Sequence, residues 1–180
     1  MSIYAIGDLH LSLAKDKPMS IFGKNWKEHE QKIKKNWLEK VKENDYVILL
    51  GDFSWATYLE EAYDDFKYLD ELPGKWNLLE TENSEKMINR ENNRLKLSIE
   101  DGIQKFGKEK EIVVFMHYPP ITINNANSEF VKTMKQYEIK RCYYAHLHGN
   151  SHKDAIEGIK NGIYFKLISA DYLKFDLFEI

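Results

Sequence analysis

The sequence predicts an α/β domain with a mixed sheet, and three observations support this class. Short apolar runs of strand length alternate with helix-length stretches of mixed polar and apolar residues. The chain has 180 residues, 43% of them apolar, which is enough for one well-buried core and small for two, so we expect one domain over residues 1–180. Four apolar runs end directly at an aspartate or a histidine, as expected where the carboxyl ends of strands form a ligand crevice.

The expected elements follow one another with short connections. Strands are expected at residues 3–7, 46–51, 112–116 and 142–145, and helices at residues 26–42, 56–71, 84–106 and 128–137. Residues 156–160 and 163–169 are expected to form a hairpin, because Asn161-Gly162 supplies the positive φ angles of a tight turn. A last strand is expected over residues 172–180. This antiparallel C-terminal part makes the predicted sheet mixed.

Composition and charge narrow the class of protein. The net charge of −3 provides no basic footprint for nucleic acid, so a nucleic-acid partner is unsupported. The one cysteine, Cys142, lies in an apolar run and cannot form an internal disulfide. The first residues lack the basic and apolar segments of a secretory signal, and no apolar run approaches the roughly 20 residues of a transmembrane helix. We therefore expect a cytoplasmic protein without a membrane partner.

Aspartates follow the first two predicted strands. Asp8-Leu9-His10 separates two polar side chains by two positions, so both would face the same side of an extended chain and share one ion. Asp52 follows the second strand, after Gly51. Each motif is weak alone, because an isolated Asp-x-His is more often a turn aspartate beside a surface histidine, and Gly-Asp commonly marks a turn.

Histidines follow the later strands. His146-Leu147-His148 repeats the two-residue spacing with two imidazoles, while Leu147 points away and Gly149 allows a sharp exit from the strand. His117 stands between a predicted strand and two prolines that end it. A single histidine at such a place is more often structural. The combination of four histidines and two aspartates at strand ends predicts a metal centre.

The six expected metal ligands are Asp8, His10, Asp52, His117, His146 and His148. Carboxylate and imidazole donors suit Mn, Fe or Zn better than Ca, and a single cysteine is too few for a thiolate-dependent site. Two such ions about 3.5–4 Å apart can hold a hydroxide and stabilise the attacking and leaving oxygens of phosphoryl transfer, with Asp52 as the expected bridging carboxylate. The remaining histidines, His29 and His152, fit surface positions better, although His152 is close to His148 in sequence.

Four sequence blocks, in this order, resemble the motifs of the calcineurin-like metallophosphoesterase superfamily. They are Gly7-Asp8-Leu9-His10, Gly51-Asp52-Phe53-Ser54-Trp55, His117-Tyr118-Pro119-Pro120 and His146-Leu147-His148-Gly149. The resemblance, which is nearest to small bacterial predicted phosphohydrolases, implies a layered sandwich of mixed sheets flanked by helices. It also implies two divalent metal ions, one held by Asp8, His10, Asp52 and His148 and the other by Asp52, His117 and His146. The implied activity is hydrolysis of small phosphoesters, phosphodiesters above all, by a hydroxide that the two metals activate.

The chain departs from the family pattern in one block. The family has a Gly-Asn-His block, which supplies an asparagine ligand and a histidine near the leaving group, and no such block occurs here. We expect an internal deletion that removes this block and at least one central strand. The alternative is that residues 76–79 still form the strand and that Glu82 or Asn83 takes the asparagine's place. A lesser departure is Ala145, where relatives usually have glycine.

The missing histidine leaves the catalytic acid unassigned and two functions open. The first is a metal-dependent phosphoesterase with impaired activity, because a positioned acid is worth roughly 10²–10⁴-fold in rate. The alternative is a non-catalytic relative that binds metal or phosphate. A nuclease is a weaker possibility, because the acidic balance supplies no backbone-binding groove.

Overall fold

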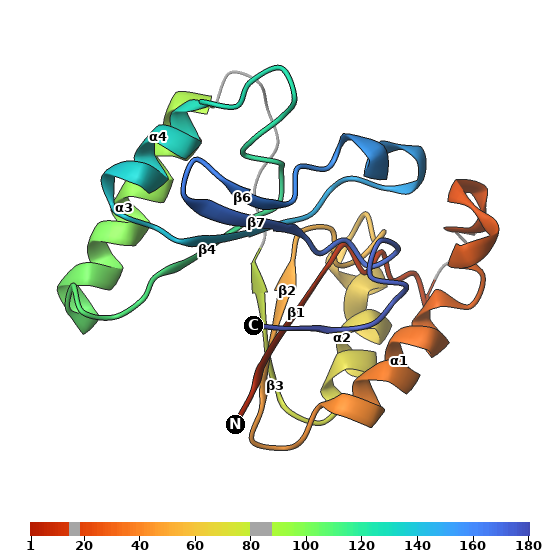
Figure 1. Cartoon of the computed structure of the whole chain (residues 1–180). Coiled ribbons are helices and arrows are strands. Elements are labelled where there is room, and N and C mark those ends of the chain that lie inside the picture. The colour runs from red at the N-terminus through yellow and green to blue at the C-terminus, as the bar shows by residue number, and fades with distance from the viewer. Residues whose placement is uncertain (15–18, 80–87) are drawn as a thin grey trace.

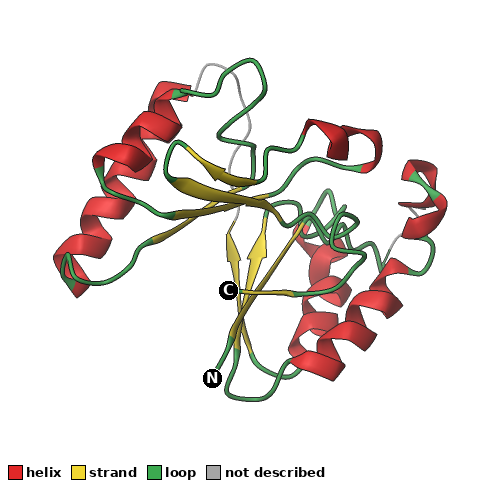
Figure 2. Ribbon diagram, in the orientation of Figure 1, coloured by secondary structure: helices red, strands yellow, loops and turns green. Residues whose placement is uncertain are grey.

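Two mixed β-sheets form the centre of the structure, and helices cover the outer side of each sheet (Figure 1). The structure is a computed structural model, which describes residues 1–14, 19–79 and 88–180. Within this part of the chain the layers follow in the order helices, sheet, sheet, helices (Figure 2). The observed class is therefore α/β with two mixed sheets, as the sequence predicts.

The first sheet has the strand order β3-β2-β1-β8. Its strands are β1 (Ile3–Gly7), β2 (Tyr46–Leu50), β3 (Lys75–Leu79) and β8 (Phe178–Glu179). The first three are parallel, and β8 is antiparallel to β1. Its outer side is covered by α1 (His29–Lys40) and α2 (Tyr63–Asp70), which are preceded by the 3₁₀ turns η1 (Met19–Phe22), η2 (Lys24–Trp26) and η3 (Leu59–Ala62).

The second sheet has the strand order β4-β5-β7-β6. Its strands are β4 (Val113–Met116), β5 (Arg141–Tyr144), β6 (Gly158–Lys160) and β7 (Ile163–Leu167). The strands β4, β5 and β7 are parallel, and β6 forms the expected antiparallel hairpin with β7. Its outer side is covered by α3 (Ile88–Phe106) and α4 (Glu129–Gln136), and the 3₁₀ helix η5 (Gly149–Asp154) lies between β5 and β6.

Strand side chains alternate between an outer core and the layer between the sheets. In β1, Tyr4 and Ile6 pack against the helices, whereas Ala5 packs against the other sheet. In β5, Tyr144 packs under α3 and α4, whereas Tyr143 faces the first sheet. Both faces of these strands are buried, which explains why they read as continuous apolar runs. No described helix is long and apolar enough to cross a membrane.

Segment 75–79 forms a strand, whereas the expected deletion of a central strand relative to the family stays a prediction. β3 pairs in parallel with β2 over five residues and forms the edge of the first sheet. The alternative interpretation of this segment as a strand is therefore confirmed. Its second half concerned Glu82 and Asn83, and these residues lie outside the described ones.

Three expected element boundaries are wrong. The helix expected from residue 26 begins at His29, because Glu28 has a left-handed φ of 54°. The helix expected from residue 56 begins as a 3₁₀ turn and becomes an α-helix at Tyr63. The strand expected over residues 172–180 is reduced to β8, because the chain turns at Lys174 and Phe175, which both have positive φ. Apolar alternation did not distinguish this turn from a strand.

The two sheets approach each other closely at one edge. A Cβ atom on Gly7 would lie 2.6 Å from the Cβ of Ala145, so β1 and the segment after β5 are in contact. Gly7 also donates its N–H to Ile168 O and accepts from Ala170 N, both at 2.7 Å. These backbone bonds connect the end of β1 to the chain leaving β7. The carboxyl ends of strands from both sheets therefore meet at the same edge.

Candidate metal centre

The shared edge brings together all six sequence-predicted ligands. Asp8, Asp52 and His117 follow β1, β2 and β4 by no more than two residues, and His146 and His148 follow β5. His10 lies two residues beyond Asp8. Polar contacts connect members of the two sheets, for example between His146 N and Asp8 Oδ2 at 2.7 Å. The carboxyl ends of parallel strands are the usual place for such a crevice.

The backbone at these ligands is turned, so the expectation of extended ligand pairs is wrong. Asp8, His10 and His146 have φ angles of 56°, 47° and 71°. Hydrogen bonds from Asp8 N to Leu50 O (2.9 Å) and from His10 N to Asp52 O (3.0 Å) hold the first two turns. Such conformations cost about 1–3 kcal/mol each and persist where the surrounding structure fixes them, often at functional sites.

Gly51 makes room for His117. Its φ is +73°, and a Cβ at this position would lie 1.7 Å from His117 Nδ1. Glycine adopts this backbone conformation without strain, and because it has no Cβ atom the imidazole ring can lie directly against it. The Gly-Asp pair therefore has two functions, because Gly51 admits His117 and Asp52 supplies a carboxylate.

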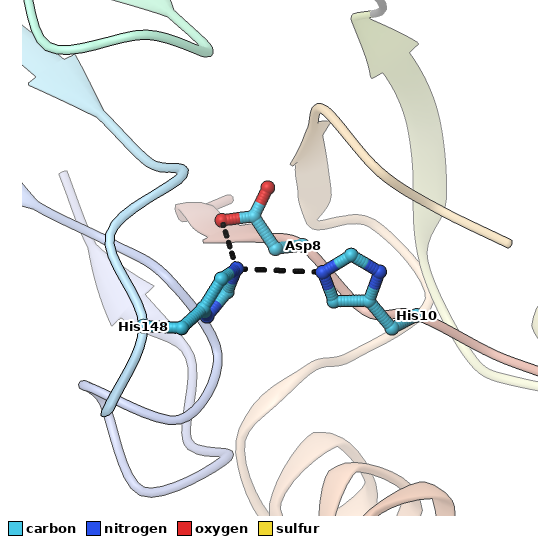
Figure 3. Close-up of side chains that lie close together, drawn as sticks. All are labelled: Asp8, His10 and His148. Atoms are coloured by element: carbon cyan, nitrogen blue, oxygen red, sulfur yellow. Dashed lines mark hydrogen bonds and ion pairs between the residues drawn. The ribbon is translucent and has the colours of Figure 1, made fainter. Parts of the chain in front are cut away.

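A first group of possible metal ligands consists of Asp8, His10 and His148 (Figure 3). His10 Nε2 and His148 Nε2 lie 3.4 Å apart, and His148 Nε2 lies 3.5 Å from Asp8 Oδ2. Asp8 and His10 lie on the segment after β1, and His148 faces both of them from the segment after β5. Trp55 stacks on the His10 ring with 5.1 Å between the ring centroids, which helps to fix the ring plane.

A second group consists of Asp8, Asp52 and His117. His117 Nδ1 is 3.2 Å from Asp8 Oδ1, and His117 Nε2 is 4.0 Å from Asp52 Oδ2. His146 adjoins this group, because its Nδ1 lies 3.1 Å from His117 Nε2. Asp8 is the carboxylate common to both groups, whereas Asp52, the expected bridging carboxylate, belongs to the second group alone.

Burial divides the site into a floor and a rim. Asp8 and His117 are 1% and 3% exposed, and His10 is also buried. The Asp52 side chain is 57% exposed, His146 is exposed, and His148 is half-buried. The buried residues of the floor keep their donor atoms away from bulk water, while the residues of the rim leave one side of the site open to solvent.

The electrostatics keep two imidazoles neutral near pH 7. Burial lowers the pKa of His10 to about 4, although Asp8 opposes this shift. Burial also lowers the pKa of His146. Burial acts the same way on His148, but hydrogen bonding to Asp171 and the charge of Asp8 outweigh it, so its pKa is raised. A neutral imidazole has the free lone pair that a metal ligand needs.

The Asp8 carboxylate stays ionised in spite of its burial. Burial raises the pKa of Asp8. This effect is outweighed by the hydrogen bond and charge of His117, the charge of His148 and the hydrogen bond from the His146 N–H, so the net shift of the pKa is downward. Ser169 Oγ also donates to Asp8 Oδ2 at 3.0 Å. The floor of the site therefore holds a buried negative charge close to the neutral imidazole of His10.

The donor set fits divalent metal ions. Asp8 Oδ1 and His117 Nδ1 are buried and lie 3.2 Å apart, but among the described residues neither atom makes a well-aligned hydrogen bond, so a bound ion could satisfy them better than they satisfy each other. Donors bound to one ion at about 2.1 Å lie roughly 3.0–3.4 Å apart. The separations of 3.4 Å between His10 and His148 and 3.1 Å between His117 and His146 agree with this range.

Sequence reasoning missed one residue of the site and misplaced another. Asp171 is 5% exposed and contacts the Nδ1 atom of His148 at 2.8 Å. Its signal was present, because it follows the apolar strand β7 by a few residues, as the other acidic candidates follow theirs. His29 is buried rather than on the surface: its ring nitrogens each lie 3.2 Å from a backbone carbonyl oxygen, of Trp26 and of His10.

Comparisons with known proteins give information on the fold alone. No protein-family model matches the chain, and no curated protein does. Among solved structures, the chain is similar to AQ665, a protein of unknown function from Aquifex aeolicus, with a TM-score of 0.61 and 17% sequence identity. The similarity covers 99% of this chain and 95% of that chain. At this identity the comparison shows a shared α/β fold.

Proposed function

We propose that this protein is a metal-dependent phosphohydrolase that hydrolyses small phosphoesters, phosphodiesters in particular. The observation that carries the proposal is the convergence of two carboxylates and four imidazoles at one edge of two sheets, with Asp8, His10 and His117 buried there. The calcineurin-like resemblance of the four sequence blocks supports the same reaction. Neutral imidazoles beside carboxylates favour Mn, Fe or Zn.

Each group of residues would hold one ion. Asp8, His10 and His148 are placed for the first, and Asp52, His117 and His146 for the second, with Asp8 between them. Ions bound there would supply positive charge to the phosphoryl oxygens and lower the pKa of a water molecule that attacks phosphorus. A phosphoester would enter at the rim, where the side chains of Asp52 and His146 are exposed.

The chain's own residues prepare the site for this chemistry. Ser169 and the His146 N–H hold the Asp8 carboxylate in one orientation, and Trp55 fixes the plane of the His10 ring. Groups held in place before substrate binds need no reorganisation during the reaction. Tyr118 packs against the His146 ring, with 4.3 Å between their centroids, and limits its rotation at the rim.

The leaving group receives no histidine proton from the described residues outside the six ligands. His29 faces backbone carbonyls, and His152 Nε2 lies 3.2 Å from Asp171 Oδ2. We therefore expect esters with good leaving groups, such as nitrophenyl phosphodiesters, to react much faster than alkyl esters, because a positioned acid is worth roughly 10²–10⁴-fold. The same observation favours a second candidate, a non-catalytic protein that binds metal or phosphate.

Hydrolysis of bis-p-nitrophenyl phosphate distinguishes the two candidates. We expect the purified protein to release p-nitrophenol when Mn²⁺ is added and Asp52→Asn to abolish the release. Asp52 is an exposed side chain, so this substitution should leave the fold intact. Asp101→Asn is the matched control, because Asp101 is an exposed carboxylate on α3 that pairs with Lys105. Mn²⁺ binding without any turnover would refute the enzyme and support the binding protein.

A further inference from the structure

Asp171 is a buried carboxylate outside the two ligand groups. Its Oδ1 accepts a hydrogen bond from His148 Nδ1 at 2.8 Å. Its Oδ2 accepts from the Gly149 N–H at 3.0 Å and lies 3.2 Å from His152 Nε2. Both oxygens therefore point at the segment that carries His148. A carboxylate with 5% exposure and this set of partners leaves His148 little freedom to rotate.

The segment that carries Asp171 also touches the other side of the site. Ser169, two residues earlier, donates to Asp8 Oδ2 at 3.0 Å. The backbone between them is fixed against β1 by the bond from Ala170 N to Gly7 O. One short segment after β7 thus orients two donors of the first group, Asp8 through Ser169 and His148 through Asp171.

We infer that Asp171 is a positioning residue, which holds His148 in the tautomer with a proton on Nδ1 and with Nε2 turned toward Asp8 and His10. A carboxylate that accepts from Nδ1–H leaves the lone pair on Nε2, the atom that faces His10 Nε2 at 3.4 Å. Carboxylate partners of this kind fix the orientation of metal-binding imidazoles and increase their basicity. The consequence for metal binding rests on the proposed function, whereas the orientation of His148 does not.

A purely structural role for Asp171 predicts a different outcome. In that case its removal would lower the stability of the fold through the lost Gly149 contact and leave His148 unchanged. Asp45 offers a matched comparison, because it is another buried carboxylate that accepts two backbone hydrogen bonds, from Ser2 N at 2.7 Å and Lys42 N at 2.9 Å. Asp45 immediately precedes β2, at the end of that strand opposite Asp52.

The test compares Asp171→Ala, Asp171→Asn and Asp45→Ala with the wild-type protein. Long-range ¹H–¹⁵N spectra of the metal-free proteins report the His148 tautomer, and calorimetric titration with Mn²⁺ alone reports affinity. We expect Asp171→Ala to lose the single Nδ1–H tautomer and to bind Mn²⁺ about 10- to 100-fold more weakly. Asp171→Asn should keep part of the Nδ1–H tautomer and part of the Mn²⁺ affinity, since its amide oxygen can accept a hydrogen bond from His148 Nδ1–H. Asp45→Ala should melt at a lower temperature but keep the wild-type affinity and tautomer.

The two readouts separate this inference from the proposed function. An unchanged His148 tautomer in folded Asp171→Ala would overturn the positioning role, and so would a wild-type Mn²⁺ affinity in that variant. A wild-type protein that binds no Mn²⁺, but whose His148 tautomer depends on Asp171, would refute the metal site while it supports the orientation of His148 by Asp171.

Discussion

Replacing Gly51 by alanine tests whether the backbone at the end of β2 shapes the metal centre. The new Cβ would stand 1.7 Å from His117 Nδ1, so the imidazole must move. Gly162→Ala is the matched control, because Gly162 has a similar φ of +79° but its Cβ would meet nothing within 4 Å. The control therefore measures the backbone cost alone, and the difference between the two variants measures the displacement of His117.

The structure gives the expected magnitudes. A non-glycine residue at such a φ costs about 1–3 kcal/mol. In a domain of this size 1 kcal/mol lowers the melting temperature by about 2–4 °C, so Gly162→Ala should melt about 2–12 °C below the wild type. Gly51→Ala should lose about a further 1–3 kcal/mol, because the displaced His117 leaves buried polar groups without partners.

The assay is thermal unfolding by circular dichroism in EDTA and again with Mn²⁺. The wild type and Gly162→Ala should gain stability from Mn²⁺, by about 2.7 kcal/mol at a concentration 100 times the dissociation constant. Gly51→Ala should gain much less, since one ligand is out of place. If Gly51→Ala has the same melting temperature as Gly162→Ala and is stabilised equally by Mn²⁺, then Gly51 does not make room for a metal-binding His117.

Two further predictions concern pH and helix capping. The pKa of His10 in the folded protein is about 4, below its ordinary value of 6.5. Between these two pH values the unfolded chain binds a proton at His10 and the folded protein does not, so the free energy of unfolding falls as the pH drops from about 6.5 to 4. Urea unfolding at pH 7 and pH 5 should show that His10→Gln loses less free energy of unfolding between these pH values than the wild type does, and an equal loss would contradict this. Ser128 Oγ accepts from Val131 N at 3.2 Å and so caps α4. Ser128→Ala should cost about 1 kcal/mol, or about 2–4 °C in melting temperature, and an unchanged melting temperature would show that the cap contributes nothing.

Strand positions and site residues were predictable because both depend on local patterns. The apolar runs before Asp8, Asp52 and His117 form strands in which both faces are covered, and such runs are visible in sequence. Their carboxyl ends converge through the geometry of parallel pairing, so the closeness of the six candidate residues could be expected without a structure. The Asn161-Gly162 turn was predictable because its residues carry the required φ angles.

The remaining features depend on tertiary contacts, which local patterns leave ambiguous. The segment 75–79 has alternating half-buried side chains, and only its pairing with β2 makes it a strand. Asp171 looks like a turn aspartate until the fold brings it against His148. His29 lies four residues before Ile33 and eight before Trp37, on the face of α1 that is buried, and the sequence analysis did not use this spacing. The left-handed turns at Asp8 and His10 arise from hydrogen bonds to the chain after β2.

Anomalous diffraction from crystals grown with Mn²⁺ tests the proposed metal centre most directly. Data collected on both sides of the manganese absorption edge locate the ions without reference to activity. We predict two peaks at the shared edge of the sheets, one among Asp8, His10 and His148 and one beside Asp52, His117 and His146. Crystals of Asp8→Asn should lose both peaks or weaken them strongly, because Asp8 belongs to both groups. An ordered site with no peak at saturating Mn²⁺ would contradict the metal centre and the function proposed from it.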